Sequence, residues 1–354
     1  MTSSNQNPTN HPRLPQIDMV KGWAIIGVTL IHSWVLADSR WMTFLFYHSV
    51  PVFLVLFGLN SEGWFERHEG KHRLQRWYGR GFRRILIPAW ASCLAWWAIV
   101  IILRPPEEMV RLKLTLPFWH LIGWFKQIGT SWFITLILQL FAIFPLFFAF
   151  RRKFGWTALL VTASAITLPI TMFPLDVKGV LGDAGWLIFA PRFAIHVAFG
   201  MWLAARVDRK GPRSVVLAVL VLLPLYAIED RLILPEWWRV ADRFLEMPLS
   251  VVLLAGMAAL SRIASIEKPL SWLGQHSWGL YLGQMLTHNA FLYRFGGGCN
   301  LYGCSEGIFE RWNLWIYSGV LLAGSIAFVW FGNWLVEQNE QLRRKGWALP
   351  SLAD

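Results

Sequence analysis

The stretch IDMVKGWAIIGVTLIHSW, residues 17–34, is apolar enough to enter a lipid bilayer, yet it contains Asp18, Lys21 and His32. Ionisable side chains inside a membrane usually face the interior of a helix bundle or a wet cavity. Lys21 and His32 are separated by almost three whole helical turns, so both are expected on one helix face. Asp18 lies one turn before Lys21 and can pair with it. The stretch therefore predicts a membrane helix with a functional polar face.

The whole chain has the composition of a polytopic membrane protein. Of its 354 residues, 55% are apolar and only 15% are charged, whereas a soluble domain has about 25% charged residues. The polar first 16 residues lack the charged start, short apolar stretch and cleavage site of a signal peptide. We therefore expect this segment to remain in the cytoplasm.

Windows of about twenty apolar residues predict ten membrane helices, since that length of helix crosses a bilayer. The predicted fold class is all-α, a polytopic membrane protein with about ten transmembrane helices and both termini cytoplasmic. The predicted spans are 18–37, 41–60, 84–103, 132–150, 156–174, 186–205, 214–229, 244–261, 271–293 and 313–336. We expect one transmembrane domain, 17–340, between a flexible N-terminus, 1–16, and a cytoplasmic tail, 341–354.

Charge is distributed unequally between the two sides of the predicted bundle. With the N-terminus inside, the cytoplasmic segments contain 20 basic and 8 acidic residues, whereas the outer segments contain 11 of each. The formal net charge of +12 thus lies on the cytoplasmic side, as the positive-inside rule requires. A basic chain can indicate a nucleic-acid partner, but topology explains this charge. We expect contact with membrane lipids and none with nucleic acid.

The predicted outer segments contain two features with more than one interpretation. Cys299 and Cys304 share a loop on the oxidising side, where they either form a disulfide or remain free thiols. Several aromatic residues suit sugar rings but equally suit anchors at the membrane interface. These residues are Trp119, His120, Trp237 and Trp238.

Three ionisable residues fall in the outer half of the predicted bundle. His48 lies on the second span at about the depth of His32 on the first, so the two imidazoles are expected to line one chamber; a packing role for His48 is the alternative. Arg192 and His196 form an i, i+4 pair, predicted on one face of the sixth span. We expect these residues to contribute to one polar site in the outer half of the bundle.

The cytoplasmic segment RHEGKHRLQRWYGRGFRR, residues 67–84, combines basic residues with Trp77 and Tyr78. Arginine can grip phosphates bidentately, and an adenine ring stacks on an aromatic or guanidinium plane. The segment therefore fits a ligand that carries phosphates and an aromatic base, and the predicted contacts are Arg80, Arg83 and Arg84. The alternative is a loop that fixes topology or contacts anionic lipid headgroups.

Several stretches resemble acyltransferase family 3. IDMVKGWAIIGVTLIHS is similar to the opening helix of that family, FYHSVPVFLVLFGLN to its second helix, and RGFRRILIPAW to the basic entry of its third. SWFITLILQL and LSWLGQHSWGLYLGQ resemble weaker patterns. The resemblance covers roughly residues 13–340 and is strongest to the fucose 4-O-acetylase-like branch. Gln284 departs from the family pattern, which often has a histidine there, so no catalytic role is assigned to it.

The resemblance implies a membrane O-acyltransferase of the bacterial cytoplasmic (inner) membrane. Such an enzyme moves an acetyl group from acetyl-CoA, its co-substrate, to a hydroxyl of an envelope carbohydrate or exopolysaccharide. No permanently bound cofactor and no metal are expected. The expected partners are acetyl-CoA, a carbohydrate or lipid-linked glycan acceptor, and, if the reaction is part of polysaccharide synthesis, an assembly complex.

The ionisable residues receive the following expected roles. A sugar hydroxyl needs a base to remove its proton, and His32 is our candidate, acting either as that base or as a covalent acyl carrier. Lys21, steadied by Asp18, positions the donor or shapes the pocket. His48, Arg192 or a backbone amide supplies charge or a donor to the oxyanion, and His196 lies with them on the acceptor or oxyanion side. Arg80, Arg83 and Arg84 are expected to bind the phosphates of acetyl-CoA.

Two other function classes are compatible with buried ionisable groups. A transporter or flippase for a sugar-linked or anionic substrate also has charged residues along its path, but no broken-helix repeat supports it. A membrane scaffold of an envelope-assembly complex would tolerate loss of His32.

The charge distribution makes a topological prediction. A reporter fused after Asp354 should be cytoplasmic, and one inserted in the 294–312 loop should be outside, because basic segments stay in the cytoplasm. Dual-reporter activity and protease accessibility measure both positions. The opposite location of either reporter would contradict the ten-span arrangement.

Overall fold

The computed structural model describes residues 14–33, 42, 46–103, 132–172, 189–206, 239–295 and 314–344. Within these ranges the regular structure is helical, in agreement with the predicted all-α class. The α-helices are α1 (Pro15–His32), α3 (Ser49–Arg67), α4 (Arg73–Gly81), α5 (Ile87–Leu103), α8 (Trp132–Met172), α10 (Ala194–Ala204), α12 (Arg239–Leu260), α13 (Ala264–Gln275), α14 (Ser277–Phe295) and α16 (Leu314–Arg344).

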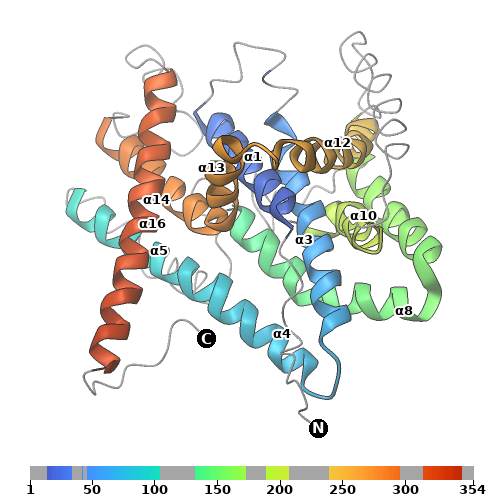
Figure 1. Cartoon of the computed structure of the whole chain (residues 1–354). Helices are drawn as coiled ribbons and strands as arrows, with labels where there is room; N and C mark the ends of the chain where they lie inside the picture. The colour runs from blue at the N-terminus through green and yellow to red at the C-terminus, as the bar shows by residue number, and fades with distance from the viewer. Residues whose placement is uncertain are drawn as a thin grey trace.

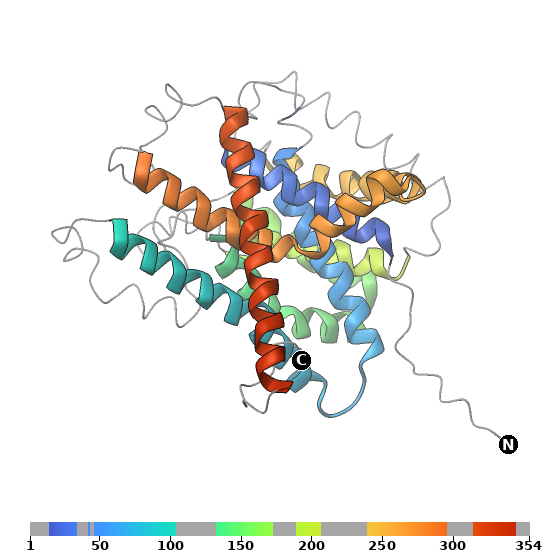
Figure 2. The ribbon, with the colours of Figure 1, turned by 60° about the vertical axis from the view of Figure 1, so that its left-hand side comes forward.

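Helices α1 and α3 occupy the middle of the bundle (Figure 1). α13 and α12 pack against α1, and α10 packs against α3. α14 contacts both α5 and α16, and Figure 2 shows α16 crossing these helices. A π-helical turn, η2 (Phe82–Leu86), joins α4 to α5, and a 3₁₀ turn, η4 (Ala190–Phe193), leads into α10.

Two of the predicted spans have different boundaries in the structure. α3 begins at Ser49, with Pro51 in its first turn, where proline fits because the N–H groups there have no intrahelical partner. His48 is thus the residue preceding the helix and not a mid-span residue as predicted from span 41–60. His32 is the last residue of α1, whereas span 18–37 placed it inside the helix.

The predicted span 271–293 is wrong as a single helix. The chain breaks at His276, which has φ −100° and ψ 9°, between α13 and α14. Both the backbone N–H and the ring nitrogen Nδ1 of His276 lie within hydrogen-bond distance of the Trp272 carbonyl oxygen. The ring nitrogen adds a second contact to a carbonyl that already accepts the last backbone bond of α13, and the non-helical backbone of His276 separates this helix from α14.

The spans 132–150 and 156–174 correspond to the two arms of α8. Gly155 separates the arms with φ 84° and ψ 179°, a backbone conformation that is open to glycine because it has no Cβ. The two apolar arms of α8 thus agree with the two predicted spans. The seventh predicted span, 214–229, lies outside the described residues.

In the described part of the chain, two helical stretches are long and apolar enough to cross a membrane, Trp132–Thr171 and Trp315–Trp334. The first contains the Gly155 break. Glu246–Leu260 is a shorter apolar helix. The count of ten spans and the side on which each terminus lies remain predictions.

Glycine pairs let the central helices approach each other closely. A Cβ at Gly58 of α3 would overlap the carbonyl oxygen of Val197 in α10, and a Cβ at Gly200 of α10 would overlap that of Val55 in α3. α1 and α13 have the same reciprocal arrangement. Small residues at such crossings allow backbone-to-backbone packing between membrane helices.

We predict that Gly200→Ala lowers the stability of the protein, because its methyl group would push α10 away from α3. Overpacking of this kind costs about 1–3 kcal/mol. Thermal denaturation in detergent, followed by the loss of monodisperse protein, measures the effect. Gly256→Ala in α12 is the control, since a Cβ there meets nothing within 4 Å. Equal melting temperatures for both variants would contradict the close crossing.

Candidate active site

A cavity of about 1600 Å³ lies between α1, α3, α4, α8 and α14. Small-molecule pockets typically measure about 300–1,000 Å³, so this cavity has room for a long ligand. Its lining includes Lys21 and His32 of α1, Arg80 of α4 and Arg84 of η2. The structure thus brings the basic segment 67–84 and the polar face of the first helix to one cavity.

Aromatic side chains form much of the remaining lining. They come from α3, α4, α8 and α14 and are Phe53, Phe57, Trp64, Trp77, Trp132, Phe133, Phe141, Trp156, Trp278 and Tyr281. Such a lining suits a ligand with an apolar or uncharged middle section and a charged end.

The predicted pair of Asp18 and Lys21 is present. Lys21 Nζ lies 3.3 Å from Asp18 Oδ1, with the lysine side chain 24% exposed and the aspartate side chain 4% exposed. Asp18 lies where α1 and α13 cross, because Gly274 of α13 abuts the Asp18 backbone. Both side chains line the cavity, and the pair holds an ammonium group near its wall.

His32 contacts Gln284 of α14. Gln284 Nε2 lies 2.7 Å from His32 Nδ1 and 3.3 Å from the Val28 carbonyl oxygen. Thr29 Oγ1 lies 3.4 Å from Gln284 Oε1. Gln284 is only 1% exposed, so its polar side chain is held behind the imidazole and not in solvent.

A second imidazole, that of His288, lies beside His32. The two ring centroids are 6.1 Å apart, and His288 Nδ1 is 2.6 Å from the hydroxyl of Tyr317 on α16. His288 follows Gln284 by one helical turn, so both face α1. The sequence interpretation named Gln284 but assigned it no role, and it did not find His288 or Tyr317, although a polar i, i+4 pair in an apolar window was a usable signal.

The basic end of the cavity is crowded with guanidinium groups. Arg67, Arg80 and Arg84 line it, whereas Arg83 is not part of the lining. Arg80 is half-buried, and the other three are exposed. Burial, and then the neighbouring Arg84 and Arg67, lowers the pKa of Arg80 from its ordinary value. Within the described ranges, no carboxylate forms an ion pair with Arg80 or Arg84. An anionic ligand would relieve this repulsion.

Trp77 fixes α4 beside the cavity. Its indole stacks on Phe141 of α8 with ring centroids 3.9 Å apart and donates a hydrogen bond of 2.9 Å to the Phe141 carbonyl oxygen. The residue is buried, so its main contribution is to hold the helix that carries Arg80. Tyr78, by contrast, is 46% exposed.

Another arginine at this end, Arg151 of α8, has acidic partners. It forms ion pairs with Glu62 and Glu66 of α3, and its guanidinium lies over the rings of Phe148 and Trp156. These contacts join α8 to α3 at the basic end of the cavity. They also distinguish Arg151 from Arg80 and Arg84, for which no acidic partner is found among the described residues.

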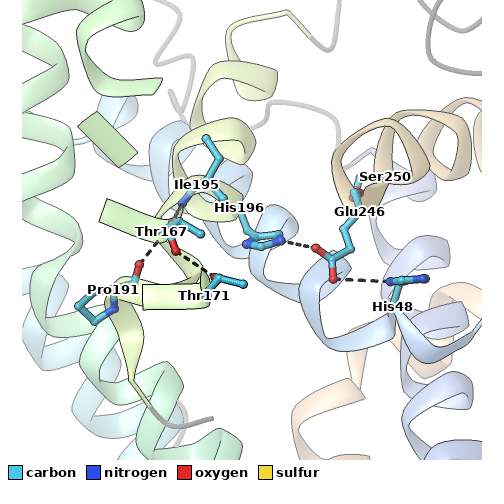
Figure 3. Close-up of polar contacts among 8 residues, drawn as sticks. All are labelled: His48, Thr167, Thr171, Pro191, Ile195, His196, Glu246 and Ser250. Carbon is cyan, nitrogen blue, oxygen red and sulfur yellow. Dashed lines mark hydrogen bonds and ion pairs between the residues drawn. The ribbon is translucent and has the colours of Figure 1, made fainter. Parts of the chain in front are cut away.

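His48 and His196 flank the carboxylate of Glu246 (Figure 3). His196 Nε2 is 2.5 Å from Glu246 Oε2, and His48 Nδ1 is 3.5 Å from Glu246 Oε1. All three side chains are at most 2% exposed, and none lines the cavity. This buried network connects α3, α10 and α12, and Glu246 is a member that the sequence interpretation missed.

Arg192 is buried in η4, with its guanidinium over the Phe193 ring. The predicted pair of Arg192 and His196 spans the change from η4 to α10, so the two residues do not share one regular α-helix. Arg192 and His196 are also absent from the cavity lining. An acceptor or oxyanion role for His48, Arg192 and His196 remains a prediction.

Several predicted residues lie outside the part of the chain that the structure describes, namely Trp119, His120, Trp237, Trp238, Cys299 and Cys304. Among the described residues, no group of three or more histidine, cysteine, aspartate or glutamate side chains is arranged to hold a metal ion.

A family model described as an acyltransferase domain matches residues 14–342. The chain belongs to acyltransferase family 3. Since proteins of this family are embedded in membranes, the chain is a membrane acyltransferase. The match covers every helix of the cavity. No curated protein and no solved structure matches the chain. Membership of the fucose 4-O-acetylase-like branch remains a prediction.

Proposed function

We propose that this acyltransferase moves an acetyl group from acetyl-CoA to a hydroxyl of an envelope carbohydrate or exopolysaccharide in the bacterial cytoplasmic membrane. The observation that supports the proposal is the cavity that contains both the crowded guanidinium groups and His32. A phosphate-binding end and a proton-accepting group in one cavity match a large anionic donor and a hydroxyl acceptor.

The donor would lie along α1. Its phosphates bind Arg80 and Arg84, for which no acidic partner is found among the described residues, while its uncharged arm follows the aromatic lining. Lys21 and His32 are separated by roughly 16 Å along the helix, since each residue adds 1.5 Å. A donor that is extended over this length brings its thioester to the imidazole while its charged end stays near Arg80.

The reaction at His32 is an attack of the acceptor hydroxyl on the thioester carbonyl. The hydroxyl proton goes to a ring nitrogen of His32 as the new C–O bond forms. The C–S bond then breaks, and coenzyme A leaves as a thiolate that takes a proton from the imidazolium. His32 thus returns to its neutral form, and no oxidant or reductant is needed.

Arg80→Ala should raise the Michaelis constant for acetyl-CoA more than that for the acceptor, because a lost phosphate contact weakens ground-state binding. The matched control is Arg83→Ala, which removes the same charge from an exposed position outside the lining. Steady-state kinetics with both substrates varied measures the difference. If both variants raise the Michaelis constant for acetyl-CoA equally, the donor is bound by the overall positive charge of the segment and not by the cavity.

His32→Asn should leave the protein folded but lower kcat by at least roughly 100-fold, the lower range for loss of a general base. Acetyl transfer by detergent-purified protein, followed by mass spectrometry of the glycan product, measures this. The comparison variant is His288→Asn, which alters the neighbouring imidazole. A parental rate for His32→Asn would disprove its role, and inactivity of His288→Asn alone would point to His288 as the base. A transporter would show no acetyl-CoA turnover at all.

A further inference from the structure

The contact between Gln284 and His32 has a chemical consequence for the imidazole. A neutral imidazole carries one proton, so one ring nitrogen donates a hydrogen bond and the other accepts one. The partner of one nitrogen therefore determines what the other nitrogen can do. Gln284 is within 2.7 Å of Nδ1, so it determines whether Nε2 can accept a proton.

The structure has the amide nitrogen of Gln284 facing His32 Nδ1. In this orientation Nε2 of Gln284 donates to Nδ1 and to the Val28 carbonyl oxygen, 3.3 Å away. Nδ1 is then an acceptor, and the single ring proton must be on Nε2 of His32. An imidazole in this state can donate a hydrogen bond to a ligand from Nε2, but that nitrogen cannot take the proton of a hydroxyl.

If the terminal amide of Gln284 rotates by half a turn, its oxygen and nitrogen exchange places, and the ring proton of His32 moves to Nδ1. Gln284 Oε1 then accepts from Nδ1–H of His32, and Gln284 Nε2 donates to Thr29 Oγ1. The Thr29 hydroxyl continues the chain by donating to the Ile25 carbonyl oxygen, 3.0 Å away. The weak 3.3 Å contact to Val28 is lost, but a helical carbonyl already has the amide four residues later as its partner.

We propose that Gln284 is the positioning residue that selects the tautomer of His32, and that its carbonyl oxygen faces Nδ1–H in the reactive enzyme. This leaves the lone pair of His32 Nε2 available for the acceptor hydroxyl. The inference rests on the proposed function only in that the hydroxyl is taken to be that of the carbohydrate acceptor. The effect of Gln284 on the tautomer of His32 depends only on the contact between the two side chains.

The surroundings hold Gln284 in place for this task. Gly283, its neighbour in α14, abuts Ser325 of α16, and Thr287 of α14 abuts Gly324 of α16. These contacts fix the position of α14 along α16. The imidazole of His288 lies beside the His32 ring, and its own Nδ1 contacts the Tyr317 hydroxyl. Gln284 is thus the group from α14 that bonds Nδ1.

Kinetics of two substitutions test the proposal. Gln284→Leu offers no acceptor to Nδ1–H, so kcat should fall while the Michaelis constant for acetyl-CoA stays unchanged. In the serine protease triad a wrong tautomer lowers kcat by about 10⁴. A neutral amide restrains the ring less than that carboxylate, so we expect a loss of at least about 10-fold. Gln284→Glu retains an acceptor oxygen and should stay near the parental kcat.

A double-mutant cycle separates this effect from general damage. In the His32→Asn background, Gln284→Leu should cause no further loss, because the imidazole that it orients is absent. Parental kcat in Gln284→Leu would overturn the proposal. So would a folded Gln284→Glu protein that is as slow as Gln284→Leu, with folding judged by thermal denaturation.

Nitrogen-15 NMR of histidine-labelled protein in lipid nanodiscs tests the tautomer without any turnover, with His32→Asn used to assign the signals. Gln284→Glu should place the proton of His32 on Nδ1, and parental protein with bound coenzyme A should do the same. A proton on Nε2 in either sample would overturn the proposal. If parental protein turns over no acetyl-CoA, the proposed function fails, but the tautomer in Gln284→Glu still decides the present inference.

Discussion

Close backbone contact between α1 and α13 is the constraint on which the candidate site depends. Gly22 of α1 abuts the Leu270 backbone, and Gly274 of α13 abuts that of Asp18. Because one face of α1 is occupied in this way, its polar face with Lys21 and His32 is left to line the cavity. The same contact sets the start of α14, which follows α13 after a single residue and carries Gln284 to the far end of α1. A larger residue at either glycine would therefore change both ends of the site.

The features that the sequence predicts well depend on local spacing. Helical periodicity places Lys21 and His32 on one face, and the structure has both in one cavity. The i, i+3 relation predicts the contact of Asp18 with Lys21, which is present at 3.3 Å. The all-α class follows from composition. These predictions need only the geometry of one helix and the cost of leaving a charge in lipid.

The features that the sequence does not predict depend on contacts between distant segments. Gln284 is 252 residues from His32, and no rule of spacing relates two helices so far apart. Glu246 approaches His48 and His196 only through the packing of α12 on α3 and α10. Arg80, Arg83 and Arg84 are equivalent by composition, but the helical turns that carry them direct Arg80 and Arg84, and not Arg83, to the cavity lining. Tertiary packing thus decides which of several similar residues can act.

The π-helical turn between α4 and α5 also bears on how this part of the chain can evolve. Its i→i+5 bonding accommodates one residue more than an α-helical turn does. Removal of one residue from Phe82–Leu86 would therefore leave an ordinary α-helical turn and would not rotate the later side chains of α5. The aromatic and aliphatic residues of α5 that meet α14 would keep their contacts. Natural variation in this turn can therefore include the loss of one residue, which elsewhere in a helix would rotate all later side chains by about 100°.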